Sequence, residues 1–205
     1  MGVPFNPLTE ESMTKRKLVI IDDNVDQRFV LKGLLTDIGC EVIGEGKSGL
    51  DAVELMQKLS PDAVLMDVKL PGMDGIEATM AINKLKPTPV ILLTARKDEE
   101  TIKRAVEAGV MAYLVKPIRE EELLPTIELA ISVFKEFQLV SKQNLELKEK
   151  IEARKIIEKA KGLLMEKEGL SEMDAFSRIQ KLSMDKRRSM KEIAEILIAA
   201  LEGGR

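Results

Sequence analysis

Three carboxylates follow two short apolar segments in the first third of the chain. Asp22 and Asp23 come directly after Lys17–Ile21, and Asp67 comes directly after Val64–Met66. In a parallel sheet the carboxyl ends of both segments lie at one edge, where ligands bind in such folds. Carboxylates this close repel one another and need a cation. Because the chain has no histidine and one cysteine, the fitting ion is Mg²⁺, which prefers carboxylate, water and phosphate oxygens.

Two further polar side chains end two later apolar segments and complete a set suited to phosphoryl transfer. Thr94 ends Val90–Thr94 with a hydroxyl, and Lys116 ends Ala112–Lys116 with a positive charge. The lysine and Mg²⁺ would stabilise the charge of a transferring phosphoryl group, and Asp67 would be the nucleophile. A single aspartate after a strand usually caps a helix or begins a turn. One polar group at each strand end, in this order, favours chemistry instead.

The segments that position these side chains alternate between strand and helix patterns. Continuous apolar runs are typical of strands buried on both faces of a parallel sheet. The predicted strands are Lys17–Ile21, Glu41–Gly44, Ala63–Met66, Val90–Thr94 and Ala112–Val115. The helical patterns between them cover Phe29–Ile38 and lie near residues 49–59, 75–85 and 99–108. This alternation predicts an α/β fold with a five-stranded, doubly wound parallel sheet.

Composition excludes several kinds of site and indicates two modules. The chain has 205 residues, 44% of them hydrophobic and 33% charged. The single Cys40 excludes a disulfide framework, and the absence of histidine excludes the catalytic dyads and metal sites built on it. No apolar run approaches the roughly 18 residues of a membrane span, so we expect a cytoplasmic protein without membrane contact. Residues 1–137 have a net charge of −6 and residues 138–205 of +3, which together give −3 and suggest different partners.

The motifs of the first module resemble the receiver domains of two-component response regulators. The resemblance covers about residues 16–136 and implies a flavodoxin-like fold. It rests on Asp22-Asp23, Met66–Gly75, Leu93–Ala95, Ala108-Gly109 and Ala112–Pro117. By this resemblance, Asp67 accepts a phosphoryl group from the phosphohistidine of a sensor histidine kinase.

The same resemblance implies the metal ligands of the site. Asp23, Asp67 and the backbone carbonyl of Lys69 would bind Mg²⁺, and Asp22 would help through water.

The resemblance also implies the residues that hold the phosphate and transmit the signal. Thr94 and Lys116 would hold the phosphoryl oxygens. Tyr113 would swing inward as Thr94 moves and carry the signal to the fourth and fifth helices. The bond between Lys116 and Pro117 is typically cis in this family, which an X-Pro bond permits.

From about Glu120 to Lys167 the chain reads as one long helix with a heptad-like apolar stripe. The stripe has alternating spacings of three and four residues: Ala130, Val133, Phe137, Val140, Asn144, Leu147 and Ile151. Asn144 occupies an a position, where a buried asparagine can fix the register and strand number of a coiled coil. The stripe could instead pack on the protein's own core, but we favour a parallel dimer.

The tail predicts a small all-helical domain with a basic surface. Helices are expected at about Ser171–Met184 and Ser189–Leu201, with Ser171 and Ser189 as N-caps. The predicted core of three helices contains Ile156, Ile157, Ala160, Leu163, Leu164, Ala175, Phe176, Ile179, Leu182, Ile193, Ala194 and Leu197. Basic residues on such helices are more often simply solvated than bound to nucleic acid.

Residues of the tail resemble the ANTAR family over about residues 150–201. The matching motifs are Ala160–Met165, Ser171–Phe176, Ser183–Arg187 and Ile193-Ala194. ANTAR domains are three-helix RNA-binding domains of transcription antiterminators, and they bind paired RNA hairpins as dimers. The resemblance implies that Lys161, Arg178 and Arg187 contact RNA.

These expectations divide the chain into four parts. They are a flexible lead-in at 1–15, a receiver domain at 16–136, a helix at 120–151 that continues into a coiled-coil linker, and an ANTAR domain at 150–205. We expect a non-enzymatic response regulator that is phosphorylated on Asp67, forms a homodimer when phosphorylated and binds structured RNA hairpins to control transcription antitermination.

Two other functions are compatible with parts of the sequence. Lys191–Leu197 resembles the first helix of a DNA-binding helix-turn-helix, but only residues 202–205 remain for a turn and a recognition helix. An Asp-dependent phosphatase would need an acid/base carboxylate beside Asp67, where the sequence has Lys69 and Leu70.

Overall fold

The computed structural model describes residues 15–95 and 99–202. The chain divides into two compact units, one ending at Phe137 and the other beginning at Gln138. The expected lead-in at 1–15 lies outside the described residues except for Lys15. Among the described residues, no helix has the length and apolar character needed to cross a membrane.

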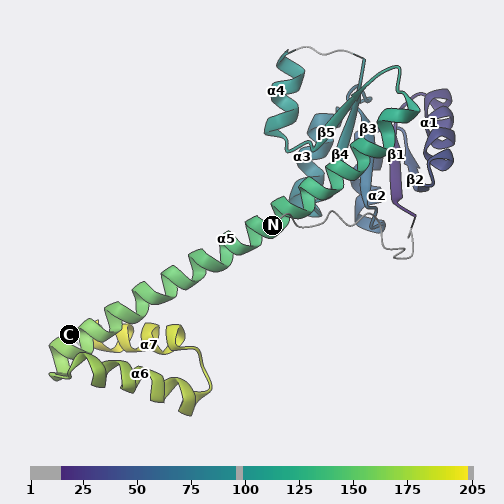
Figure 1. The fold of residues 1–205 in the computed structure, drawn as a ribbon. Coiled ribbons are helices and arrows are strands. Elements are labelled where there is room, and N and C mark those ends of the chain that lie inside the picture. The colour runs from purple at the N-terminus through teal and green to yellow at the C-terminus, as the bar shows by residue number, and fades with distance from the viewer. Residues whose placement is uncertain (1–14, 96–98, 203–205) are drawn as a thin grey trace, which may run out of the picture. The chain divides into compact units, whose positions relative to one another are not determined.

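The first unit contains a parallel sheet of five strands, as predicted (Figure 1). The strands are β1 (Lys17–Ile21), β2 (Glu41–Gly46), β3 (Ala63–Asp67), β4 (Val90–Thr94) and β5 (Ala112–Val115). Their order is β2-β1-β3-β4-β5, and every neighbouring pair is parallel. This order confirms the doubly wound, flavodoxin-like sheet. From β1 the chain adds β2 on one side of the sheet and β3, β4 and β5 on the other. At this change in the direction of winding, a crevice forms between the carboxyl ends of β1 and β3.

Helices cover both faces of this sheet (Figure 1). They are α1 (Val25–Asp37), α2 (Gly49–Lys58), α3 (Gly75–Leu85), α4 (Glu99–Glu107) and α5 (Glu120–Glu168). Successive side chains of a strand point to opposite faces. Leu18 and Ile20 therefore pack with α1 and the start of α5, while Val19 and Ile21 pack with α2 and α3.

Short polar motifs begin the two helices that follow β1 and β3. The Asn24 side chain accepts hydrogen bonds from the backbone N–H groups of Asp26 and Gln27 at the start of α1. Asp74 and Glu77 form a reciprocal capping box at the start of α3. Both caps satisfy backbone donors that a helix N-terminus leaves unpaired, so they fix where each helix begins relative to its strand.

The second unit is the predicted three-helix domain. It consists of the later part of α5 with α6 (Glu172–Lys186) and α7 (Met190–Glu202). Its buried apolar core contains Ala160, Leu164, Ala175, Ile179, Ile193 and Ala194. The predicted N-caps are confirmed, because the Ser171 and Ser189 hydroxyls accept hydrogen bonds from backbone N–H groups three residues later, both at 3.2 Å. Phe176 was wrongly assigned to the core: it is 42% exposed.

The apolar stripe of α5 has two parts. Ala130 is buried in the core of the first unit, so this position packs on the protein itself. The remaining apolar positions are exposed on α5: Val133, Phe137, Val140, Leu147 and Ile151. Asn144 is also exposed. These positions therefore do not belong to the core of either unit.

Candidate phosphoryl-transfer site

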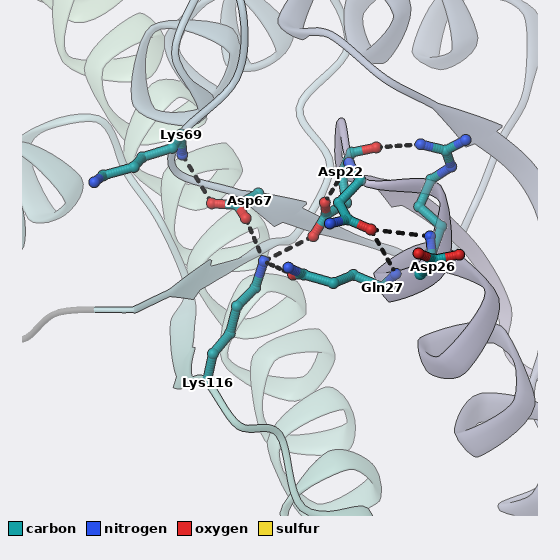
Figure 2. A network of polar contacts seen from close by, with 8 residues as sticks. Asp22, Asp26, Gln27, Asp67, Lys69 and Lys116 are labelled. Carbon is teal, nitrogen blue, oxygen red and sulfur yellow. Dashed lines mark hydrogen bonds and ion pairs between the residues drawn. The ribbon is translucent and has the colours of Figure 1, made fainter.

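Asp22, Asp67 and Lys116 meet at the carboxyl edge of the sheet (Figure 2). Asp22 follows β1, Asp67 is the last residue of β3, and Lys116 follows β5. Lys116 Nζ donates a hydrogen bond to Asp22 Oδ2 at 2.7 Å and another to Asp67 Oδ2. The Asp22 side chain is only 2% exposed, and that of Asp67 is 14% exposed. Two carboxylates from different strands thus share one ammonium group in a largely buried position.

The electrostatics of this cluster favour a charged lysine. Burial by itself lowers the pKa of Lys116, since it penalises the ammonium form. The hydrogen bonds and charges of Asp22 and Asp67 outweigh burial, and the pKa of Lys116 is raised above its usual value. The lysine therefore remains positively charged and can attract a phosphoryl group.

Backbone and side-chain contacts fix the loop that contains Asp22. The Asn24 backbone N–H donates to Asp22 Oδ1 at 2.9 Å, and the Arg28 guanidinium donates to the Asp22 carbonyl at 2.5 Å. The Asp22 N–H donates to the Gly46 carbonyl at 3.1 Å. The predicted strand at Glu41–Gly44 was two residues too short, and the two added residues reach this contact.

The segment after Asp67 is equally constrained. The Lys69 backbone N–H donates to Asp67 Oδ1 at 2.8 Å, so the carboxylate is held from both oxygens. Gly75 lies against the backbone of Asp67: a Cβ atom there would be 2.2 Å from the Asp67 carbonyl oxygen. Only glycine allows α3 to begin this close to the end of β3.

Thr94 and Tyr113 lie together at the α4 side of the site. Thr94 ends β4, and its carbonyl accepts a hydrogen bond from the Lys116 backbone N–H at 2.8 Å. Tyr113 of β5 is 45% exposed, and both residues line a narrow cavity of about 20 Å³ together with Thr101 and Ile102 of α4. The peptide bond between Lys116 and Pro117 is cis, as expected.

The remaining predicted ligands lie near the site but are exposed. Asp23 follows Asp22 directly and Lys69 lies two residues after Asp67, and both are exposed. Within residues 15–95 and 99–202, no group of three or more aspartate, glutamate, cysteine or histidine side chains is arranged to hold a metal ion. The close pair is Asp22 and Asp67, and one or two carboxylates with water and phosphate oxygens are the donors that Mg²⁺ usually takes.

The two halves of the chain match two known domain families. Residues 18–128 match the response regulator receiver domain, and residues 145–198 match the ANTAR domain. The transcriptional regulatory protein PdtaR of Mycobacterium tuberculosis (strain ATCC 25618 / H37Rv) is 41% identical over 196 residues, which cover 95% of this chain and 96% of PdtaR. The protein is a response regulator with an ANTAR output domain. The match to PdtaR along nearly the whole chain favours a regulator over an enzyme.

Solved structures of receiver domains resemble the first unit of this response regulator. The receiver domain of a modulated diguanylate cyclase from Desulfovibrio desulfuricans G20 is 30% identical with a TM-score of 0.56, and the match covers 59% of this chain and 97% of that domain. The receiver domain of a sensor histidine kinase from Pseudomonas aeruginosa PAO1 is 29% identical with a TM-score of 0.53, covering 58% and 98%. That structure has a magnesium ion coordinated in its active site cleft.

The receiver site contains one contact that the sequence analysis missed. Gln27, on the first turn of α1, accepts a hydrogen bond from Lys116 Nζ at 2.6 Å (Figure 2). It also lines a cavity of about 580 Å³ between α1 and the residues that follow Lys116. The available signal was its position in the first helical turn after the aspartate pair, but spacing alone does not show which side chain reaches the lysine.

The three basic residues predicted to contact RNA have different environments in the ANTAR domain. Lys161 is 6% exposed and donates to Glu158 at 3.0 Å and to Glu172 at 2.7 Å. Arg178 forms an ion pair with Glu168.

Arg187 differs from both. It is exposed between α6 and α7 and has a left-handed backbone conformation, with φ of 52°. Among the described residues, no hydrogen bond or ion pair engages its side chain.

Proposed function

We propose that this response regulator accepts a phosphoryl group on Asp67 from a sensor histidine kinase and thereby controls RNA binding by its ANTAR domain, with transcription antitermination as the outcome. The observation that carries the proposal is the convergence of Asp22, Asp67 and Lys116 at the point where the strand order reverses. The proposed domains are a receiver at 16–136, a helix at 120–151 that continues into a linker, and an ANTAR domain at 150–205, in a cytoplasmic protein.

The transfer uses the Asp67 carboxylate as the nucleophile. An Asp67 oxygen attacks phosphorus, the bond between phosphorus and the donor's imidazole nitrogen breaks, and the imidazole leaves with that electron pair. The product is an acyl phosphate on Asp67. Lys116 stabilises the charge on the phosphoryl oxygens, because its ammonium group already touches the accepting carboxylate. Thr94, at the end of β4, would hold another phosphoryl oxygen.

Mg²⁺ fits the donor set of this site. Asp22 and Asp67 offer carboxylate oxygens, with Asp23 and the Lys69 carbonyl beside them, and the described residues of the site include no sulfur or imidazole ligand. When bound, Mg²⁺ would neutralise charge on the phosphoryl oxygens. The magnesium-bound relative from Pseudomonas aeruginosa supports the same assignment.

Phosphorylation would shift the receiver between two states through Thr94 and Tyr113. A phosphoryl group adds roughly two negative charges at the sheet edge, so it favours a state in which Thr94 and Lys116 turn toward it. Tyr113 shares the narrow cavity with Thr94 and α4, and it would move inward when Thr94 vacates that space. The equilibrium moves only as far as phosphate favours one state over the other.

The exposed stripe of α5 would pair with the same stripe of a second copy in the phosphorylated protein. Its apolar residues from Val133 to Ile151 lie in solvent on one helix, where they cost free energy unless they are covered. Asn144 occupies an a position of this stripe, where opposing amides in a parallel dimer hydrogen-bond across the interface and penalise other registers.

Among the three predicted contacts, Arg187 is the strongest candidate for RNA binding. It lies in the basic run Lys186–Arg188 and is exposed. Lys161 and Arg178 already have carboxylate partners, so a phosphate would have to displace Glu172 from one and Glu168 from the other. All three residues remain proposed RNA contacts. Because phosphate must first displace a carboxylate from Lys161 and Arg178, we expect these two residues to contribute less to RNA affinity than Arg187.

The phosphorylation step is tested with the intact protein, Mg²⁺ and phosphoramidate as a small donor. We expect a mass increase of one phosphoryl group on the wild type and none on Asp67→Ala. Asp26→Ala is the matched control, because Asp26 lies near the site without contacting Lys116, and it should be phosphorylated. A wild type that remains unmodified, or an Asp67→Ala variant that is modified equally, would refute the phosphoacceptor assignment.

The output is tested with RNA hairpins selected from a random-loop pool against the phosphorylated protein. We expect phosphorylated protein to bind them more tightly than unphosphorylated protein, with affinity falling steeply as salt rises. Duplex DNA at the same salt should bind more weakly. Equal hairpin affinity with and without phosphate, or preference for DNA, would contradict the proposal.

A further inference from the structure

Lys116 donates a hydrogen bond to a third partner, which is an amide and not a carboxylate. Its ammonium group donates to Asp22 Oδ2, Asp67 Oδ2 and Gln27 Oε1 (Figure 2). A lysine ammonium group has three N–H donors. In the resting protein all three are therefore used, and none is left for an incoming phosphoryl oxygen.

The three partners differ in how readily they can be replaced. Asp22 is buried and charged, so separating it from Lys116 would leave an uncompensated charge in the core. Asp67 is the acceptor itself. Gln27 is neutral and exposed at the start of α1. Water can therefore replace Lys116 as the hydrogen-bond donor to its amide oxygen at little cost.

We propose that Gln27 is a positioning residue that holds Lys116 in the resting receiver and is released when a phosphoryl oxygen takes its donor. This inference rests on the proposed phosphorylation of Asp67. Because Gln27 accepts the hydrogen bond from Lys116 only in the resting state, breaking this bond slows phosphoryl uptake. The bond is absent from the phosphorylated state, so the lifetime of the acyl phosphate stays unchanged. Gln27 also lines the 580 Å³ cavity, which gives its side chain room to move aside.

Two substitutions of similar length should change the uptake rate in opposite directions. Gln27→Met keeps the side-chain length but removes the acceptor, so the maximal rate of Asp67 phosphorylation should rise about fivefold, equivalent to about 1 kcal/mol. Gln27→Glu adds a charged acceptor for Lys116, so the maximal rate should fall by at least as much. A purely structural role would lower the rate in both variants.

A matched control separates local contact from overall charge. Gln57→Glu adds the same charge on an exposed position of α2. Repulsion of the anionic donor should raise the half-saturating concentration in both glutamate variants, whereas the maximal rate should fall only in Gln27→Glu.

The experiment follows acyl-phosphate formation on the full chain with phosphoramidate and Mg²⁺ over a series of donor concentrations, and then its decay after the donor is removed. Decay rates within twofold of wild type support release of Gln27 before transfer. If Gln27→Met unfolds, Gln27→Asn, whose amide is too short to reach Lys116, takes its place and should also be faster.

The outcomes distinguish this inference from the proposed function. Wild-type protein that takes up no phosphate overturns both. Wild-type protein that is phosphorylated on Asp67, together with a Gln27→Met rate at or below wild type, overturns the role of Gln27 alone. So does a maximal rate for Gln57→Glu that falls as far as that of Gln27→Glu.

Discussion

Replacing Lys116 with methionine should destabilise the receiver, because Asp22 would be left buried without a counter-charge. The Asp22 side chain is 2% exposed and lies 2.7 Å from Lys116 Nζ. At an effective dielectric constant of about 20, charges at this distance attract by about 6 kcal/mol, but desolvation of both groups offsets much of that. Removing one partner of a fully buried pair costs about 3–5 kcal/mol. The Lys116 side chain is 19% exposed, so water reaches the site and we expect about 2–3 kcal/mol.

The double variant Lys116→Met/Asp22→Asn tests the cause of this loss. The asparagine has no charge to bury and can still accept the Asn24 N–H, so it should recover most of the lost stability. The coupling between the two substitutions should be about 2 kcal/mol.

Urea unfolding followed by tyrosine fluorescence measures this cycle in the intact protein. The chain has one tyrosine, Tyr113 of β5, and no tryptophan, so the signal reports the receiver alone. With a urea slope of about 1–2 kcal/mol per molar, the Lys116→Met midpoint should fall by about 1–3 M. A chelator keeps metal ions from replacing the lost ammonium. If the changes in unfolding free energy of Lys116→Met and Asp22→Asn are strictly additive, the ion pair does not cause the loss of stability.

Three further predictions use other parts of the chain. Gly75→Ala places Cβ against the backbone of Asp67 and should cost about 2–3 kcal/mol in urea unfolding. By contrast, Gly33→Ala, in an open helical position of α1, should stabilise by about 0.5–1 kcal/mol. The ion pair between Glu128 and Arg16 lowers the pKa of Glu128, so its stabilisation is present above the unfolded pKa and is lost as pH falls through the folded pKa. Glu128→Gln should therefore cost up to about 1 kcal/mol at pH 7 and little at a pH below the folded pKa of Glu128, as measured by urea unfolding; an equal cost at both pH values would contradict this. Asn144→Val should strengthen self-association of the phosphorylated protein but broaden its distribution of oligomers in sedimentation velocity, and an unchanged dimer would argue against pairing at that position.

The strands and the main cluster could be predicted because their signals are local. The strands that carry Asp22, Asp67 and Lys116 are short apolar runs, and each of these residues stands at or next to the carboxyl end of its strand, so topology brings them together without detailed packing. The contact of Gln27 with Lys116 could not be predicted in this way. It depends on a rotamer of an exposed side chain and on the angle at which α1 leaves β1, which sequence spacing does not define.

The tail shows where helical periodicity stops being informative. A spacing of three or four residues shows that positions share a helix face but not which neighbour covers that face. Phe176 matches the core spacing yet is 42% exposed, while the smaller Ala175 beside it is fully buried. Close helix packing at Ala160, Ala175 and Ala194 favours small side chains in the core, so an aromatic ring next to them remains at the surface.

Lys116 and Lys161 show how similar ion-pair arrangements can lead to different roles. Lys116 and Lys161 each bridge two carboxylates. Lys116 also donates to a neutral, exposed acceptor, Gln27, and one of its carboxylates is the proposed nucleophile, Asp67. Under the proposed function, phosphoryl oxygens would replace some of these partners. Lys161 bonds to Glu158 of α5 and Glu172 of α6, and these carboxylates are 55% and 72% exposed. An RNA phosphate would have to compete with these two charged groups for the ammonium, and losing the Glu172 contact would remove an ion pair between α5 and α6. Lys161 is therefore suited to stabilising the helical fold, and under the proposed function the exposed Arg187 between α6 and α7 is the better candidate for direct contact with RNA.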